Sequence, residues 1–282
     1  MILTRYLGSH LEDILTNCRL KVSRVSELND PFEFRYKVVG KMTRDAAATF
    51  LQRRLEKKDF IQQLRNYDIF RGKSDLDIKH HFQENRTTIE DNLLDTMPDA
   101  VKQLIDGVAG IADEIVRVVC FSNPTQKQLE EILLWSHYTR NHSGFRIWIN
   151  LSLEPLLSNT TREVVYSDDL ISLDINDPDI EQNAEPVFKK AMATKAICWD
   201  YEDEIRVFIP KKYCKLEKVA GNVLEYIDIS LESLTRIDFG IRFPIEERDK
   251  LIERMNEKGL SNIEFFQCGL SYDEYAIEYE EV

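Results

Sequence analysis

Two patterns of hydrophobic and polar residues follow one another along the chain. Between about residues 43 and 114, apolar residues recur at helical spacing among good helix formers, as in AAATFLQRRLEKKDFIQQLRN. This pattern predicts a helical insertion or lid at about 43–114. After it, segments rich in β-branched and aromatic residues predict strands at 115–122, 144–150, 162–167 and 198–210, with a helix over 126–141 between the first two.

The two ends of the chain predict a mixture of helices and strands. The first forty residues predict a short strand, a helix and two further strands, at Leu3–Leu7, Ser9–Asn17, Leu20–Val25 and Phe34–Val39. Ser9 suits the N-cap of that helix, with Glu12 three residues later as its capping-box partner. At the other end we expect a helix and two strands, at Glu246–Lys258, IEFFQC and AIEYEE. The acidic segment 167–186 predicts a loop or a mobile flap.

This order of elements indicates the α+β class. The chain lacks the regular alternation of strands and helices that βαβ units need, and no Pro/Gly/Ser-rich linker divides it. We therefore expect one domain over residues 1–282. Its core is expected to be a mixed, mostly antiparallel β-sheet, to which the helical insertion at about 43–114 is attached.

Composition and charge narrow the classes of function. The formal net charge is −13, whereas general nucleic-acid binding needs a basic surface, so free nucleic acid is not expected as a partner. No run approaches the roughly 18–20 apolar residues of a membrane span, so no membrane partner is expected either. The N-terminal residues lack a signal-peptide pattern. Five scattered cysteines without C-x-x-C indicate reduced thiols, and these features together predict a cytoplasmic protein.

The stretch CWDYEDEIRVFIP, residues 198–210, combines strand-forming residues with a high density of charge. In a strand alternate residues share a face, so Glu202 and Glu204 would lie on one face, roughly 7 Å apart along the strand. One interpretation is a solvated strand face whose charges pair with neighbours. The other is a carboxylate pair that lines a cleft, holds a sugar hydroxyl or stabilises a cationic intermediate.

Two further stretches carry chemically versatile side chains. In WSHYTRNHSGF, Trp135, Tyr138 and His142 would fall near one face of a helix. His137 and His142 are five residues apart, which is poor spacing for two metal ligands on one helix, so a core aromatic cluster is favoured over a metal site. NDPFE, residues 29–33, predicts a tight turn anchored by Phe32. The sequence contains no P-loop, GxGxxG or GxSxG motif.

Five of these stretches occur in a fixed order: LNDPFE, VVCFS, LLWSHYTRNHSGF, VVY and KAICWDYEDEIR. Together they resemble the bacterial family catalogued as domain of unknown function 2971. The resemblance extends from about Leu3 to Phe243 and so covers nearly the whole chain. The family name implies no activity, so this resemblance indicates kinship rather than function.

A more distant resemblance concerns function. EDEIRVFIP, residues 202–210, resembles the E-x-E strand of ADP-ribosyltransferases, which implies a split β-sheet, NAD as co-substrate and no metal. It further implies that Arg5 contacts phosphate or ribose, that Ser122 lies beside the nicotinamide ribose, and that Glu204 stabilises the oxocarbenium-like transition state. Glu202 would orient the acceptor or act as a base. The middle element is CFSNPT rather than the usual Ser-Thr-Ser.

The same resemblance suggests which side chains would bind the cofactor. Tyr6, Trp135 or Tyr138 would stack on nicotinamide. The stretch WSHYTRNH has no counterpart in the transferase pattern. The candidate cofactor-binding residues are Arg5, Tyr6, Trp135, His137, Tyr138 and His142.

Three hypotheses remain open at this point. The first is an NAD-consuming enzyme, a toxin or an anti-phage effector acting on a macromolecular acceptor, and it requires Arg5, Ser122 and Glu204 to converge on one cleft. The second is a non-catalytic regulatory domain that binds a nucleotide or a protein. The third is a metal-dependent hydrolase or nuclease that uses several acidic residues and a histidine: Asp30, Glu33, His137, Glu202 and Glu204.

Overall fold

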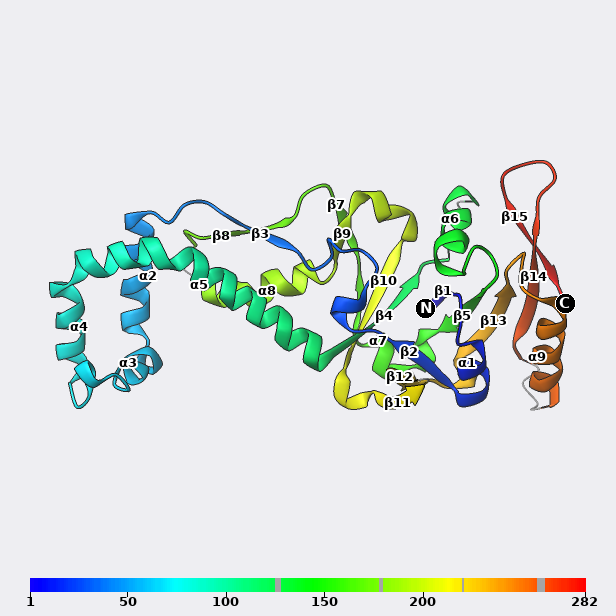
Figure 1. Ribbon diagram of the computed structural model, residues 1–282, viewed down its shortest axis with the longest axis horizontal. Coiled ribbons are helices and arrows are strands. Elements are labelled where there is room, and N and C mark those ends of the chain that lie inside the picture. The colour runs from blue at the N-terminus through cyan, green and yellow to red at the C-terminus, as the bar shows by residue number, and fades with distance from the viewer. Residues whose placement is uncertain (125–127, 178–179, 220, 258–261) are drawn as a thin grey trace. The chain divides into compact units, whose positions relative to one another are not determined.

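The computed structural model describes residues 1–282 except 125–127, 178–179, 220 and 258–261, and leaves out the side chains of 180–184. It belongs to the expected α+β class (Figure 1). The chain groups into two compact units. The first unit comprises residues 1–33, 112–168 and 193–282, and the second comprises residues 34–111 and 169–192.

An eight-stranded sheet forms the centre of the first unit, in the order β15-β14-β13-β5-β1-β4-β10-β6. All of its neighbouring strands are antiparallel except β13 and β14, which confirms a mixed, mostly antiparallel sheet. Its strands are β1 (Ile2–Leu7), β4 (Val116–Ser122), β5 (Phe145–Asn150), β6 (Thr161–Glu163), β10 (Glu204–Pro210), β13 (Leu234–Phe239), β14 (Glu264–Leu270) and β15 (Ile277–Glu281).

The pairing between β1 and β4 is confined to one point. β1 pairs with β5 along its whole length, and β4 pairs with β10 along its whole length, but β1 meets β4 only where Thr4 lies opposite Ser122. Beyond that point Ser23 exchanges backbone hydrogen bonds with Val118 of β4, with N···O distances of 3.0 and 2.8 Å. The sheet therefore separates between β1 and β4.

Smaller sheets and helices complete the first unit. β2 (Arg19–Val22), β11 (Lys215–Val219) and β12 (Asn222–Asp228) form an antiparallel sheet, and β7 (Val165–Ser167) pairs in parallel with β9 (Thr194–Ala196). The helices are α1 (Leu11–Asn17), α6 (Gln128–Tyr138), α7 (Pro155–Ser158) and α9 (Ile245–Glu257), with 3-10 turns at Val25–Glu27, Leu151–Leu153, Ile197–Glu202, Lys211–Tyr213 and Leu231–Ser233.

The two faces of the eight-stranded sheet bury different side chains. Alternate apolar residues of the strands, such as Val119, Ile147 and Val207, form the main core together with residues of α1 and α9. A smaller cluster that includes Tyr6 and Trp135 packs with α6. Since successive strand residues point to opposite faces, this alternation is what sets the register of each strand.

The second unit is mainly helical, as the periodicity of this stretch predicts. It contains α2 (Arg44–Glu56), α3 (Lys58–Leu64), a 3-10 turn at Asp68–Phe70, α4 (Asp75–Glu84) and most of α5 (Arg86–Ile115), together with α8 (Ile180–Ala191) and the parallel pair β3 (Tyr36–Val39) and β8 (Ile171–Asp174). Thr43 caps α2, since its hydroxyl accepts from the N–H of Ala46 at 3.2 Å, and Ser74 forms a capping box at α4.

Several local predictions are wrong. The acidic segment 167–186 contains β8 and the start of α8, because its apolar residues, such as Leu173 and Ile175, are buried in the second unit. The helix expected from Ser9 begins at Leu11, and the residue at its N-cap makes no side-chain capping bond. The side chain of Phe32 is 63% exposed and does not anchor the turn. The backbone N–H of Phe32 donates instead to the side chain of Asp30. Strands β9, β11, β12 and β13 are additional to those expected.

The most consequential error concerns residues 198–210. Residues Ile197–Glu202 form a 3-10 helix, Asp203 adopts a left-handed conformation with φ 41°, and the strand begins only at Glu204. Aspartate is among the residues that tolerate this conformation. The turn at Asp203 means that Glu202 and Glu204 do not share a strand face as alternate residues would.

Candidate functional site

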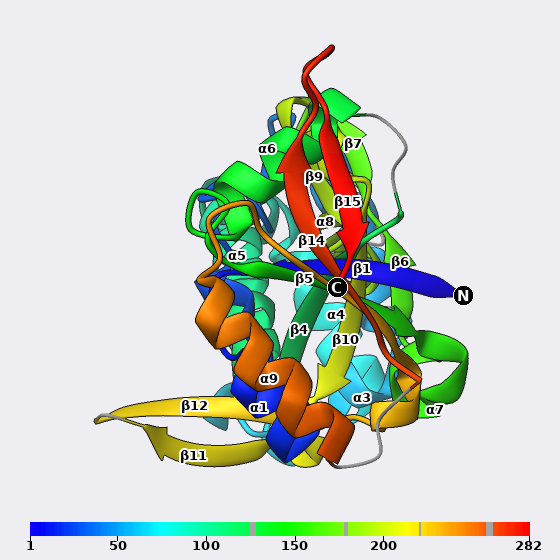
Figure 2. The ribbon, with the colours of Figure 1, turned by 90° about the vertical axis from the view of Figure 1, so that its right-hand side faces the viewer.

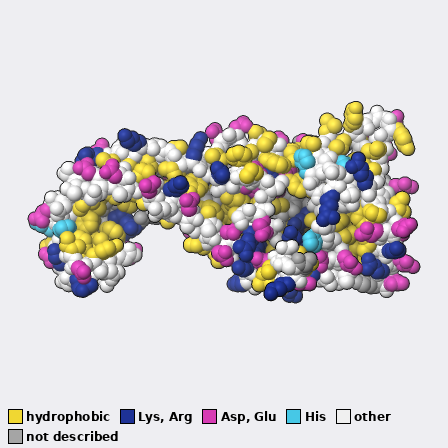
Figure 3. All heavy atoms as spheres, in the orientation of Figure 1, with side chains coloured by type: hydrophobic (Ala, Val, Ile, Leu, Met, Phe, Trp, Pro, Cys, Tyr) yellow, Lys and Arg dark blue, Asp and Glu magenta, His cyan; other side chains and the backbone are white. Residues whose placement is uncertain are grey.

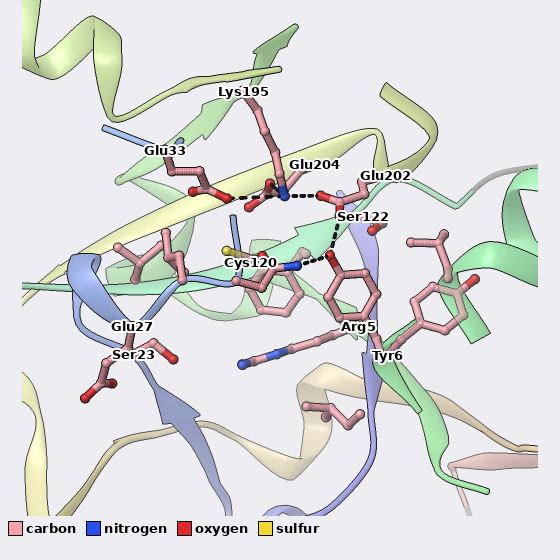
Figure 4. A pocket seen from close by; sticks show the side chains of 17 residues that line it. Arg5, Tyr6, Ser23, Glu27, Glu33, Cys120, Ser122, Lys195, Glu202 and Glu204 are labelled. Atoms are coloured by element: carbon pink, nitrogen blue, oxygen red, sulfur yellow. Dashed lines mark hydrogen bonds and ion pairs between the residues drawn. The ribbon is translucent and has the colours of Figure 1, made fainter. Parts of the chain in front are cut away.

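A cavity of about 290 Å³ opens where β1 and β4 separate (Figure 4). β1 contributes Arg5 and Tyr6, and β4 contributes Ser122 and Cys120. The remaining walls come from residues 23–33, α6, β9 and the segment around Glu204. All lining residues belong to the first unit.

The cavity brings together many of the residues predicted from the sequence. Arg5, Ser122 and Glu204 converge on it, although they are far apart in the sequence. The pairing of the strands explains this, because Ser122 lies opposite Thr4 of β1 on one side and opposite Glu204 of β10 on the other. Glu202, Tyr6 and Tyr138 line the same cavity.

A buried cluster of charges forms one wall of the cavity. The Nζ of Lys195 lies 2.6 Å from Glu202 Oε2, 3.3 Å from Glu33 Oε1 and 3.5 Å from Glu204 Oε2. Arg206 contacts Glu33 Oε2 at 2.6 Å, and its Nε donates to Glu204 Oε1 at 2.9 Å. Two cations therefore hold three carboxylates, and Figure 4 shows Lys195 between Glu33 and Glu202.

Local structure determines the positions of these side chains. β9 carries Lys195, and the six-residue 3-10 helix that follows ends at Glu202 and brings its carboxylate to Lys195. The N–H of Asn123 donates to the carbonyl of Asp203 at 3.0 Å, which ties this turn to the end of β4. The N–H of Glu204 donates to the hydroxyl of Tyr166 at 2.8 Å.

The environment separates the pKa values of the carboxylates. For Glu204, burial alone would raise the pKa, but the charge and hydrogen bonds of Arg206, with help from Lys195, lower it below its usual value. For Glu202 and Glu33, burial dominates and raises the pKa despite the nearby cations. Glu204 is therefore the carboxylate held in its ionised form, and Glu202 is the one better able to take up a proton.

Tyr138 links this cluster to the mouth of the cavity. Its hydroxyl donates to Glu202 Oε1 and accepts from Nδ2 of Asn29, the latter at 2.8 Å. Burial and the adjacent Glu202 raise the pKa of Tyr138, so the phenol keeps its proton and acts as a donor. Its ring lines the cavity, consistent with the position expected for a residue that contacts a ligand.

Arg5 lies apart from the charge cluster. Its Nη1 donates to the carbonyl of Lys21 at 3.1 Å, and no carboxylate among the described residues lies within ion-pair distance of it. Burial lowers the pKa of Arg5, but a guanidinium remains protonated at physiological pH. Within the described part of the chain, Arg5 therefore contributes to the cavity a positive charge that no carboxylate neutralises.

The other predicted cofactor-binding residues lie elsewhere. Trp135 is 0% exposed and packs edge-on against Tyr6, with 5.3 Å between ring centroids. His137 is exposed and its Nδ1 forms a hydrogen bond with the hydroxyl of Tyr201 at 2.8 Å. His142 stacks on Trp135 and lines a different cavity. None of these three residues is among those lining the 290 Å³ cavity.

Tyr6 takes part in a second buried ionic network. Its hydroxyl accepts from Arg146 Nη1 at 2.9 Å, and Arg146 also contacts Glu131 and Asp238. Tyr6 is itself largely buried, so only part of its ring faces the cavity. This network fixes the position of β1 against β5 and α6.

Sequence reasoning gave no site role to Lys195 and Arg206, and it named Glu33 only as an acidic residue of the metal-dependent hypothesis. Glu33 ends NDPFE, while Lys195 and Arg206 belong to KAICWDYEDEIR. Lys195 and Arg206 lie in otherwise apolar strand segments, TKAI and EIRVF, and a cation in a buried strand requires a carboxylate partner. That pattern in the sequence could have indicated that Lys195 and Arg206 belong to a buried cluster of charges.

Comparisons of the chain with protein-family models, with curated proteins and with solved structures find no match. Among the described residues, no group of three or more His, Cys, Asp or Glu side chains is arranged to hold a metal ion. The carboxylates that do converge are bridged by Lys195 and Arg206. No helix in the described part of the chain is both long enough and apolar enough to cross a membrane.

Proposed function

We propose that the protein is an NAD-consuming enzyme of the ADP-ribosyltransferase type, in which the 290 Å³ cavity holds the nicotinamide ribose. The observation that carries this proposal is the convergence of Arg5, Ser122 and Glu204 at the point where β1 and β4 separate. The separation itself supports the split sheet that the resemblance implies. The resemblance to domain of unknown function 2971 is compatible with this proposal but adds no activity.

The charges around the cavity suit the ligand. Three cations and four carboxylates line the cavity or lie directly behind it: Arg5, Lys195, Arg206, Glu27, Glu33, Glu202 and Glu204. One negative charge is in excess, and it complements the positive nicotinamide ring of NAD or the oxocarbenium ion formed from it. Arg5, which donates Nη1 to the carbonyl of Lys21 and has no carboxylate partner among the described residues, would bind the phosphates with its other N–H groups.

The residues then have separate tasks in the reaction. The bond between nicotinamide and ribose C1′ breaks, its electron pair leaves with the nicotinamide nitrogen, and positive charge develops on the ribose. The ionised Glu204, which is itself buried, stabilises that charge. Glu202, held by Lys195 and Tyr138, accepts the proton of the nucleophile that attacks C1′, whether that nucleophile is water or a macromolecular acceptor.

One observation favours a second candidate, a domain that binds a nucleotide without cleaving it. Both oxygens of Glu204 already accept hydrogen bonds within the protein, from Arg206 Nε at 2.9 Å and from Arg206 Nη2 at 3.1 Å. A carboxylate held in this way stabilises the fold whether or not it touches a substrate. In this alternative, Arg5 binds the nucleotide phosphates, and the buried charge cluster only forms one wall of the cavity.

The decisive experiment follows NAD turnover. Purified protein is incubated with labelled NAD, with and without cell lysate, and nicotinamide release and label on macromolecules are measured. Glu204→Gln keeps the shape of the side chain but removes its charge, and we expect a loss of release of roughly a hundredfold or more. Glu163→Gln, an exposed carboxylate on the neighbouring β6, is the matched control and should retain activity.

The two candidates give different results in this experiment. Binding of NAD without release by the wild-type protein would favour the non-catalytic domain. Release that persists in a folded Glu204→Gln variant would refute the assigned role of Glu204. Thermal unfolding of each variant, measured in parallel, separates loss of chemistry from loss of the fold.

A further inference from the structure

Strand β15 forms an open edge of the eight-stranded sheet. It pairs with β14 on one side, and none of the described strands pairs with its other side (Figure 2). Ser271 N–H donates to Ala276 O, and Val282 N–H donates to Phe265 O. Since hydrogen-bonded pairs alternate along an antiparallel ladder, the N–H and C=O groups of Ile277, Tyr279 and Glu281 point away from β14.

The hairpin that carries this edge is acidic. Beyond Lys258 the sequence contains no lysine or arginine. Glu278, Glu280 and Glu281 on β15 are exposed, as are the two acidic residues of the hairpin loop. Glu278 and Glu280 are alternate residues and therefore lie on the same face of the strand.

Two aromatic side chains extend the acidic edge at the hairpin loop. Tyr272 is 100% exposed and Tyr275 is 86% exposed. In Figure 3 hydrophobic side chains gather at the tip of this hairpin and acidic ones lie along its outer margin. Exposed tyrosines of this kind serve as anchors at interfaces and as partners for cations.

We propose that the β15 edge is a docking site for an extended segment of another protein that has lysine or arginine at alternate positions. The segment adds to the sheet as a ninth strand, and its backbone pairs with Ile277, Tyr279 and Glu281. Its basic side chains lie opposite Glu278 and Glu280 as cross-strand ion pairs. This site is separate from the proposed NAD cavity, and the inference does not depend on NAD cleavage.

Charge selects this occupant over a second copy of the same chain. Two β15 edges brought together would place carboxylates opposite carboxylates, and like charges directly opposite each other destabilise a strand pair. A basic segment removes that repulsion and replaces it with attraction. The expected interaction is therefore salt-dependent and weakens as ionic strength rises.

The test uses the full chain and synthetic peptides. A fluorescent nine-residue peptide of alternating lysine and threonine is titrated with the protein, and binding is followed by anisotropy. We expect saturable binding, and no binding of the matched peptide of alternating glutamate and threonine. Replacing both Glu278 and Glu280 by glutamine should weaken binding roughly tenfold, whereas Glu246→Gln with Glu247→Gln on α9 should leave it unchanged.

Peptide backbone methylation tests the strand geometry without altering the protein. N-methylation at alternate positions blocks the N–H groups of one strand edge only, so one methylated register should abolish binding and the other should preserve it. Equal binding by both methylated peptides would overturn strand addition. If the α9 and β15 variants bind the lysine peptide equally well, the proposal of a basic partner is overturned. It is also overturned if the wild-type protein forms a dimer and the β15 variant does not.

Discussion

Replacement of Lys195 by methionine is the sharpest test of the buried charge cluster. Methionine has a similar length but no charge, so the substitution removes the ammonium that contacts Glu33, Glu202 and Glu204. Lys195 is almost completely buried, and so are its partners. The variant leaves three buried carboxylates with only Arg206 as a cation.

The expected loss of stability follows from this imbalance. Removing one partner of a buried ion pair typically costs about 3–5 kcal/mol, because the remaining charge is left without compensation. For a unit of this size each kcal/mol lowers the melting temperature by roughly 2–4 °C, so Lys195→Met should lower it by roughly 6–20 °C at pH 7. Thermal unfolding followed by circular dichroism or calorimetry measures this shift.

The effect should depend on pH in a defined direction. The depressed pKa of Glu204 means that its contribution to stability is present above its unfolded pKa and is lost as the pH falls through the lower folded value. Glu33 and Glu202, whose pKa values are raised, take up protons more readily in the folded state, and loss of Lys195 raises them further. The difference between variant and wild type should therefore shrink from pH 7 toward pH 4.

Lys215→Met provides the matched control. Lys215 forms an exposed ion pair with Asp228, and exposed pairs contribute little to stability. We expect little change in melting temperature for this variant at any pH in the range. A Lys195→Met variant that melts like the control, or whose deficit is the same at pH 4 and pH 7, would refute the view that Lys195 neutralises buried carboxylates.

Two further predictions concern β1, which carries Arg5 and Leu7. Arg5→Met should weaken NAD binding about ten- to a hundredfold, as measured by calorimetry, because it removes charge-assisted hydrogen bonds to phosphate; unchanged affinity would place the phosphates elsewhere. Gly144→Ala should destabilise the fold by about 3 kcal/mol or more, because the new Cβ would lie 2.1 Å from the carbonyl oxygen of Leu7. In the control Gly269→Ala, the new Cβ meets no atom within 4 Å, so its melting temperature should stay close to that of the wild type.

The strand register explains why the candidate site could be predicted in part. Ser122 and Glu204 each lie in a segment whose β-branched and aromatic residues indicate a strand, and the resemblance to the E-x-E strand of ADP-ribosyltransferases implied that they meet. The position of Arg5 depended on the same reasoning. What brings these three residues to one cavity is the single pairing of Thr4 with Ser122, which no local pattern encodes.

Residues 198–210 show where local reasoning failed. The alternation of apolar and charged residues is compatible with a strand, yet a 3-10 helix and a left-handed Asp203 come before the strand. The turn allows Glu202 to form an ion pair with Lys195. Nothing in the local sequence pattern indicated that these two residues interact. An ion pair between two residues seven positions apart thus accompanies a conformation that local propensity did not favour.

The sequence by itself determined the α+β class, the helical stretch and most strands of the main sheet, because these follow from the periodicity of side chains along a local segment. Only the tertiary structure decided which charges are buried and which of them meet. Burial and pairing depend on contacts between distant segments, and a charge must find its partner when packing removes it from water. The ion pairs that join Glu33, Lys195 and Arg206 could therefore be established only in the folded chain.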